Sequence, residues 1–223
     1  MLEADDVQEC RRYLRENSRS DYLISLLLED DTRNRWAVLR AFHTEIISIP
    51  FKVSDPIPGE IRLQWWRDAL EEIAGGVKPR GHEVVDALAD VLDAEGAKLL
   101  DGLIAARRWD IYSDPFEDQA HMDSYIDAAS GHLMVTAARL LGQGDLGVVT
   151  DFAYGAGVAN LFRAIPDLED RGRKPLLDGS EAGVLALAQR GADRLNGAVK
   201  AQRQVLKSAA PALFAGYLAR PVL

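Results

Sequence analysis

The chain has 223 residues, of which 48% are hydrophobic and 27% are charged, a composition typical of one soluble globular domain over residues 1–223. Its 35 acidic and 26 basic side chains give a formal net charge of −9, which disfavours nucleic acid and any general attraction to anionic lipid. The one cysteine, Cys10, excludes an internal disulfide, and no apolar run approaches the roughly 18 residues that a membrane span needs.

The first expected element is a polar helix over residues 6–17, within the acidic segment MLEADDVQECRRYLREN. This segment has the pattern neither of a secretory signal nor of an Arg-rich, acid-poor transit peptide. We therefore expect a cytoplasmic protein.

Helical periodicity dominates the rest of the chain, and no segment reads convincingly as a strand. Further helices are expected over residues 22–28, 33–47, 60–74, 83–94, 97–112, 116–141, 144–164, 180–209 and 212–218. No internal repeat or inter-domain linker interrupts them. The pattern predicts an all-α, single-domain helical bundle.

Local signals place several helix ends. Asp21 is expected to cap the second helix, and either Asp31 or Thr32 the third. Prolines and a glycine in the segment PIPG predict a break over residues 56–59, before the fourth helix. Gly75 and Gly76 predict its end, and Pro166 predicts that the helix over residues 144–164 stops before it.

Two segments carry a resemblance to a known family. Residues 59–70, GEIRLQWWRDAL, are similar to the R-L-x-W-W-R-x-x-L signature of squalene and phytoene synthases. Residues 155–177, GAGVANLFRAIPDLEDRGRKPLL, resemble a metal-binding helix of the same family, which reads roughly G-x-A-x-Q-L-x-N-I-L-R-D-V-x-E-D-x-x-x-G-R-x-Y-L-P. The positions that keep this frame are Gly157, Asn160, Arg163, Gly172, Arg173 and Leu176. The resemblance runs from about Asp21 to about Leu177 and implies the isoprenoid-synthase fold.

The acids that the family uses to hold magnesium are mostly missing. Carboxylates four residues apart share a helix face and can hold one Mg²⁺ against a diphosphate. In the second motif, Ala164 and Leu168 stand where the resemblance places acids, and only Asp167 is acidic at such a position. After Ala41, the region of the first motif reads FHTEIISIPF and contains Glu45 alone. We therefore expect no metal site and no cofactor.

Glu45 is the sharpest polar candidate, because its neighbours along the chain are apolar. A buried carboxylate is costly unless it is paired, so we expect a partner, either Arg40 or Arg62. Two interpretations stay open. Glu45 is either a structural acid or a polar contact that remains inside a former active-site cavity.

The remaining candidates lie further along the chain. Asp123 and Asp127 flank Tyr125 on a helix that resembles the family's Y-C-x-x-V-A-G segment, and either line a cavity or carry surface charge. Arg163 and Arg173 present planar forks that suit an anion, although salt bridges with nearby acids are an equal alternative. Those acids are Asp167, Glu169 and Asp170.

The pattern at both motifs favours one branch of the family, whose mitochondrial representative helps to assemble respiratory NADH dehydrogenase. That branch resembles this chain in having R-A-F-N-x-E-L at the first motif and L-R-A-x-P at the second, where this chain reads RAFHTEI and FRAIP. The resemblance implies a non-catalytic protein that assists a respiratory complex, through a subunit or assembly protein, or that binds an isoprenoid or other apolar lipid. The alternative is a Mg²⁺-dependent head-to-head prenyltransferase, for which magnesium would be the cofactor.

Overall fold

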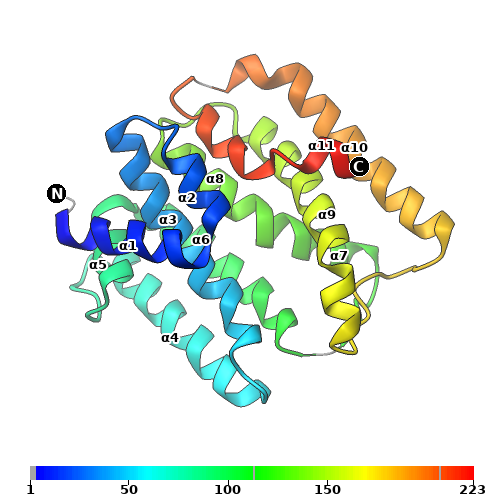
Figure 1. Cartoon of the computed structure of the whole chain (residues 1–223), viewed down its shortest axis with the longest axis horizontal. Helices are drawn as coiled ribbons and strands as arrows, with labels where there is room; N and C mark the ends of the chain where they lie inside the picture. The colour runs from blue at the N-terminus through cyan, green and yellow to red at the C-terminus, as the bar shows by residue number, and fades with distance from the viewer. Residues whose placement is uncertain (1–3, 113, 206) are drawn as a thin grey trace. The chain divides into compact units, whose positions relative to one another are not determined.

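The computed structural model describes residues 4–112, 114–205 and 207–223, and within these residues the chain is helical and contains no strand (Figure 1). The α-helices are α1 Ala4–Asn17, α2 Arg19–Ser25, α3 Asp30–Ser48, α4 Pro56–Ala74, α5 Glu83–Val91, α6 Ala94–Arg107, α7 Gln119–Ile126, α8 His132–Leu140, α9 Leu146–Asp170, α10 Glu181–Ala201 and α11 Ala219–Val222. Short helical turns connect them: η1 Ile49–Phe51, η2 Arg108–Asp110, η3 Asp127–Gly131, η4 Gln202–Gln204 and η5 Ala210–Gly216. The predicted all-α class is confirmed.

The chain forms two compact units. Unit 1 contains Met1–Ile111 and Arg139–Leu141, and unit 2 contains Tyr112–Ala138 and Gly142–Leu223. Helices α1–α6 belong to unit 1, and α7, most of α8, and α9–α11 belong to unit 2. The expectation of one domain over residues 1–223 stays a prediction. Among the described helices, none has the length and apolar character needed to cross a bilayer.

Several predicted helix starts were wrong, and at α4 the reason is a side-chain cap outside the expected range. Helix α4 begins at Pro56, where the Asp55 carboxylate accepts a hydrogen bond of 2.9 Å from the Ile57 N–H. Proline is tolerated in a first helical turn, since its missing N–H would have no helical partner there. Asp21 does not cap α2, whose N-cap is Ser18, and Glu29 holds the position predicted for Asp31 or Thr32.

The long helix predicted over residues 116–141 is divided, because η3 widens the helix between α7 and α8. The helix predicted over residues 83–94 ends at Val91, because Asp93 caps α6 and accepts a hydrogen bond of 2.7 Å from the Gly96 N–H. The helix predicted over residues 180–209 is capped by Ser180 and ends at Ala201. The last predicted helix, 212–218, falls on the η5 turn instead.

Helix α9 does not stop before Pro166 but continues through it to Asp170. Its end is built by Gly172, whose φ of +74° lies in the left-handed region. The Gly172 N–H donates to the Glu169 carbonyl at 2.8 Å, and the Arg173 N–H donates to the Leu168 carbonyl at 2.9 Å. These two bonds form a Schellman motif, so the Gly-Arg pair retained from the family frame terminates this helix.

Unit 1 is organised around α3, against which α1, α2 and α5 pack. Nearly every residue in the middle of α3 is buried, including the large side chains Trp36, Leu39, Phe42 and Ile46. This helix is therefore covered on all sides and not along one stripe. Helix α4 packs along α6 and contributes buried Trp66.

His43 lies on the same helix and is buried. Burial, followed by the charges of Arg40 and Arg107, holds the pKa of His43 well below its usual value of 6.5. The folded state thus keeps this imidazole neutral, whereas the unfolded chain takes up a proton as pH falls below about 6.5. Stability that is fully present above that pH is therefore lost as pH decreases.

We expect this linkage to cost about 1.4 kcal/mol for each pH unit below about 6.5, until the folded-state pKa is reached. Urea unfolding at pH 7.5 and pH 5 measures it for the wild type and for His43→Leu, which cannot titrate. The variant should lose about 2 kcal/mol less than the wild type between these pH values. Equal losses in the two proteins would assign the acid sensitivity to other groups.

Unit 2 is built on α9, which is packed by α10 on one side and by η3 on another. Two glycines of α9 allow this close approach. A Cβ at Gly155 would lie 2.8 Å from the Gly191 carbonyl oxygen, and one at Gly157 would lie 2.7 Å from Ile126. Gly157 of the family frame is therefore a packing residue.

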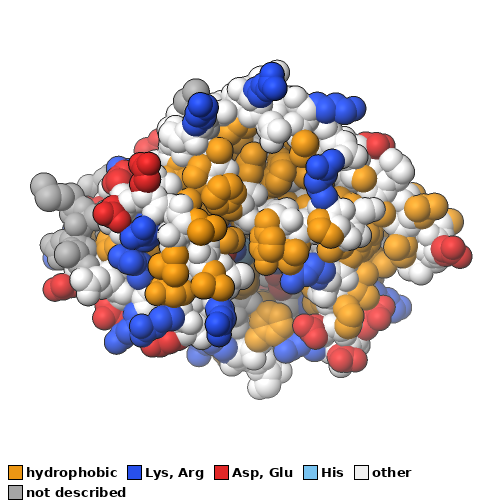
Figure 2. Space-filling model, turned by 45° about the horizontal axis from the view of Figure 1, so that its top comes forward, with side chains coloured by type: hydrophobic (Ala, Val, Ile, Leu, Met, Phe, Trp, Pro, Cys, Tyr) orange, Lys and Arg blue, Asp and Glu red, His pale blue; other side chains and the backbone are white. Residues whose placement is uncertain are grey.

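Apolar side chains also reach the surface in both units, as the face drawn in Figure 2 shows between its charged residues. In unit 1 the exposed ones include Leu23 of α2, Leu26 and Leu27 just after it and, near the start of α4, Phe51, Ile57 and Ile61. Isolated exposed apolar residues need no explanation, but grouped ones do.

Candidate functional site

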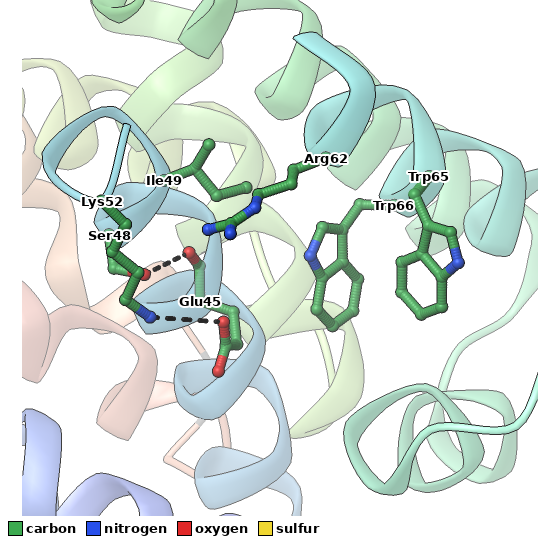
Figure 3. Close-up of a pocket in the computed structure, with 7 residues that line it drawn as sticks. All are labelled: Glu45, Ser48, Ile49, Lys52, Arg62, Trp65 and Trp66. Atoms are coloured by element: carbon green, nitrogen blue, oxygen red, sulfur yellow. Dashed lines mark hydrogen bonds and ion pairs between the residues drawn. The ribbon is translucent and has the colours of Figure 1, made fainter. Parts of the chain in front are cut away.

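A pocket of about 210 Å³ lies in unit 1, where α3, η1 and α4 meet (Figure 3). Its lining combines a carboxylate, a hydroxyl, two cations and apolar rings: Glu45, Ser48, Ile49, Lys52, Arg62, Trp65 and Trp66. Helix α3 supplies the first residues, η1 and the residue after it supply Ile49 and Lys52, and α4 supplies the rest. The site therefore contains Glu45 and Arg62, two of the residues predicted from the sequence.

The partner of Glu45 differs from both predicted ones. Its carboxylate lies 3.9 Å from the Lys52 ammonium, and its side chain is 23% exposed. Arg40 instead binds Asp21, at 2.8 Å. Arg62 forms no ion pair with Glu45 among the described residues, although Figure 3 shows its guanidinium pointing across the pocket toward α3. The sequence correctly predicted that Glu45 has a basic partner, but that partner is Lys52 and neither Arg40 nor Arg62.

Two further contacts surround Glu45. The Ser48 hydroxyl donates a hydrogen bond of 2.8 Å to the Glu45 backbone carbonyl. Burial, followed by the influence of the nearby Glu45 carboxylate, raises the pKa of Tyr13 on α1 above its usual value. Glu45 thus lies near α1 and Lys52, which favours a structural role for this acid.

The double tryptophan forms the aromatic wall of the pocket. Trp66 is buried and meets Phe42 edge-on at 5.5 Å between ring centroids. Trp65 is half-buried, contacts Trp66 at 5.2 Å, and lies under the Arg80 guanidinium at 5.4 Å. Arg80 also binds Glu72 at 2.7 Å. This part of the family signature therefore packs α4 against its neighbours and leaves one ring edge for the pocket.

The donor set of the pocket suits an anion with an apolar part better than a metal. It offers one carboxylate, already near a lysine, whereas magnesium requires several oxygen ligands. Over residues 4–112, 114–205 and 207–223, no group of three or more His, Cys, Asp or Glu side chains is placed to hold a metal ion.

The acids predicted near Tyr125 are engaged within unit 2. Asp123 accepts a hydrogen bond of 2.5 Å from the Tyr154 hydroxyl and lies 3.6 Å from Arg190. Asp127 lies 3.3 Å from Arg194.

Arg194 is the centre of this network. It also binds Asp151 at 2.8 Å and stacks over the Tyr154 ring at 4.0 Å. Burial, followed by the hydrogen bond to Asp123, raises the pKa of Tyr154 to about 12. Burial also raises the pKa of Asp127, against the opposing effect of Arg194. The carboxylates thus have arginines of α10 as counter-ions.

The other predicted residues also belong to unit 2. Asn160, Arg163 and Asp167 are exposed on α9, and among the described residues Arg163 makes no ion pair with the acids that follow it. Arg173 is buried at the Schellman turn. Tyr125 packs against Phe116 at 5.4 Å between ring centroids. Asn160, Arg163 and Asp167, at spacings of three and four residues, share one exposed face of α9.

Sequence reasoning missed Lys52, Arg190 and Arg194. Lys52 follows Glu45 by seven residues, across a turn that the sequence marked only as a proline break. Arg190 and Arg194 are four residues apart on α10, a spacing that places them on one helix face, and this is the signal that would have found them.

Comparison with protein families shows which family the chain belongs to. The family model described as squalene/phytoene synthase matches residues 14–177. The chain belongs to the squalene/phytoene synthase family. Its helical architecture is the isoprenoid-synthase fold, as predicted.

Solved structures agree with this fold. The chain is similar to squalene synthase HpnC from Alicyclobacillus acidocaldarius, with a TM-score of 0.77 and 15% sequence identity. The match covers 98% of this chain and 91% of that one. It is also similar to a dehydrosqualene synthase in complex with ligand, with a TM-score of 0.75, 15% identity and coverage of 97% and 84%. At this identity the likeness shows the fold alone.

The curated relatives belong to a different functional class. They include NADH dehydrogenase (ubiquinone) complex I, assembly factor 6, from Mus musculus and from Homo sapiens. Each is 24% identical over 161 residues, which cover 70% of this chain and 48% of the relative. The chain therefore spans about half the length of the curated relatives it matches.

Proposed function

We propose that this squalene/phytoene synthase family member is non-catalytic and acts in the assembly of a respiratory complex. The proposal rests on one observation. Acids at the family's magnesium-binding positions are replaced, and two other acids that the sequence offered as candidates lie beside basic side chains. Ala164 and Leu168 stand at acidic positions of the family frame. Glu45 faces Lys52, and Asp127 faces Arg194.

Physical chemistry explains why this arrangement disfavours catalysis. A diphosphate leaving group needs concentrated positive charge, which the enzymes of this family are expected to supply through magnesium held by carboxylates. An arginine or lysine that already neutralises a carboxylate removes the negative charge on which a metal would depend. The assembly role is supported by the curated relatives, which are complex I assembly factors.

Binding of an isoprenoid or another apolar lipid is a second role compatible with this proposal. It is supported by the pocket, in which Trp65 and Ile49 offer apolar surface beside the cations Lys52 and Arg62. No cofactor is required for either role. Under both, the protein binds without transforming its ligand.

Thermal unfolding with farnesyl and geranylgeranyl diphosphate, each with and without magnesium, tests the non-catalytic part. A ligand at one hundred times its Kd stabilises the native state by about 2.7 kcal/mol, which raises Tm by roughly 5–10 °C in a chain of this size. We expect no rise that depends on magnesium. A magnesium-dependent rise of that size would support the alternative, a head-to-head prenyltransferase.

Native electrophoresis of membranes from the source organism, with and without the gene, tests the assembly part. We expect less assembled NADH dehydrogenase when the gene is deleted, and restoration by the wild-type gene. Restoration by Asp167→Asn as well would show that the last acid of the second motif is dispensable. Unchanged complex in the deletion strain would reject the assembly role while leaving lipid binding open.

A further inference from the structure

Three large apolar side chains stand in solvent at the corner where η1 leads into α4, at the lower end of α4 in Figure 1. The exposed fractions are 56% for Phe51, 68% for Ile57 and 64% for Ile61. Ile57 and Ile61 are four residues apart and therefore share one face of α4. A single exposed isoleucine is unremarkable, but three such side chains within eleven residues form an apolar corner.

The apolar corner, Phe51 with Ile57 and Ile61, is continuous with the pocket. Trp65 lies one helical turn beyond Ile61 on the same face, and it lines the pocket. Lys52 follows Phe51 directly and lines the pocket as well. An amphipathic tryptophan ring beside exposed aliphatic side chains is characteristic of the boundary between water and lipid.

Some charged side chains around the apolar corner make short contacts within the protein, and others do not. Glu60 binds Arg108 at 2.8 Å, and the Asp55 carboxylate accepts a hydrogen bond from the first turn of α4. The side chain of Lys52 is 48% exposed, and its contact with Glu45 is long, at 3.9 Å. Arg62 is exposed at the pocket and forms no ion pair within the described part of the chain. Arg62 is therefore available to a partner, and Lys52 is held only by its long contact with Glu45.

We infer that this corner docks on the surface of a bilayer that contains anionic phospholipid. Phe51, Ile57 and Ile61 enter the boundary between headgroups and acyl chains, as the apolar face of an interfacial helix does. Lys52 and Arg62 then lie at the level of the lipid phosphates. The inference is independent of the assembly role, because it requires neither a partner protein nor a reaction.

The net charge of −9 restricts which residues can attract an anionic bilayer. The protein as a whole is repelled by an anionic surface, so any attraction must come from these few residues. An acidic protein partner would match the two cations equally well. The adjoining Trp65 and the three exposed apolar side chains favour lipid.

Flotation with phosphatidylcholine vesicles, with and without about one-third phosphatidylglycerol, tests the inference on the full chain. We expect binding to the anionic vesicles and much weaker binding to the neutral ones. Ile57→Ser combined with Ile61→Ser should reduce the affinity for anionic vesicles by about tenfold or more. Lys52→Gln and Arg62→Gln should each reduce it by about fivefold and leave binding to neutral vesicles unchanged.

Matched controls are available outside the corner. Leu185 is 67% exposed, so Leu185→Ser removes an equally exposed aliphatic side chain from α10. Lys78 is exposed beyond the other end of α4, so Lys78→Gln removes an equivalent charge. Both variants should bind vesicles as the wild type does.

Three results would overturn the inference. The first is no binding to anionic vesicles, and the second is binding that the double isoleucine variant retains in full. The third is a concentration-dependent dimer that the same variant dissociates, which would assign the apolar corner to a second copy of the chain. Because Ile57 and Ile61 are largely exposed, the unfolding transition of the double isoleucine variant should match that of the wild type.

Discussion

Replacing Asp21 by alanine is expected to lower the free energy of unfolding by about 3–5 kcal/mol, the largest effect of any single substitution proposed for this protein. The Asp21 side chain is 8% exposed and that of Arg40 is 12% exposed, with 2.8 Å between their charged atoms. Ser18 donates a further hydrogen bond of 2.7 Å to the same carboxylate oxygen. Removing the carboxylate leaves the Arg40 charge buried without its partner, and that loss costs more than the pair itself contributes.

Urea unfolding measures this loss, with Asp31→Ala as the matched control. Asp31 also pairs with an arginine, Arg35, at 2.9 Å, but its side chain is 76% exposed. The control should lose less than about 1 kcal/mol, because water replaces the lost partner. The double variant Asp21→Leu with Arg40→Met should recover part of the loss, since it removes both buried charges. Similar losses for Asp21→Ala and Asp31→Ala would contradict the burial argument.

Replacing Gly155 by valine is expected to cost about 3 kcal/mol, because α9 and α10 meet at this position. A Cβ there would lie 2.7 Å from the Leu195 side chain and 2.8 Å from the Gly191 carbonyl oxygen. A backbone carbonyl cannot rotate away as a side chain can, so the two helices must separate. Separation would also strain the contacts that Arg194 makes from α10 to Asp151.

Gly197→Val is the control for this substitution. Gly197 lies on α10 as well, but a Cβ at this position meets nothing within 4 Å. Valine has a slightly better helix propensity than glycine, so the control should be neutral or stabilised by a few tenths of a kcal/mol. Urea unfolding of both variants measures the difference. Equal stability of the two would show that the α9–α10 contact is more adaptable than its spacing indicates.

Much of the fold was predictable from the sequence, because its signals are local. The end of α4 at Gly75 follows from a glycine signal that is local in the chain. The sequence also showed that Gly157 and Gly172 match the family pattern, but it did not show why glycine stands at these positions. The structure supplies that reason: Gly157 allows η3 to approach α9, and Gly172 ends α9 in a left-handed turn.

Helix boundaries were less predictable, because competing local signals differ by small free energies. Pro166 was expected to end a helix, yet α9 continues for four residues beyond it. Near a helix end proline removes few hydrogen bonds, and the Schellman motif at Gly172 stabilises the longer helix.

By itself, the sequence determined the helical class, the family frame and the loss of acids at the positions of Ala164 and Leu168, because each depends on residue type and spacing along the chain. Only the tertiary structure decided which acids are paired with basic side chains. Lys52 reaches Glu45 across a turn, and Arg194 reaches Asp127 over 67 residues. Ion pairs of this kind depend on how helices pack, and helix packing brings together charges whose separation in sequence carries no signal.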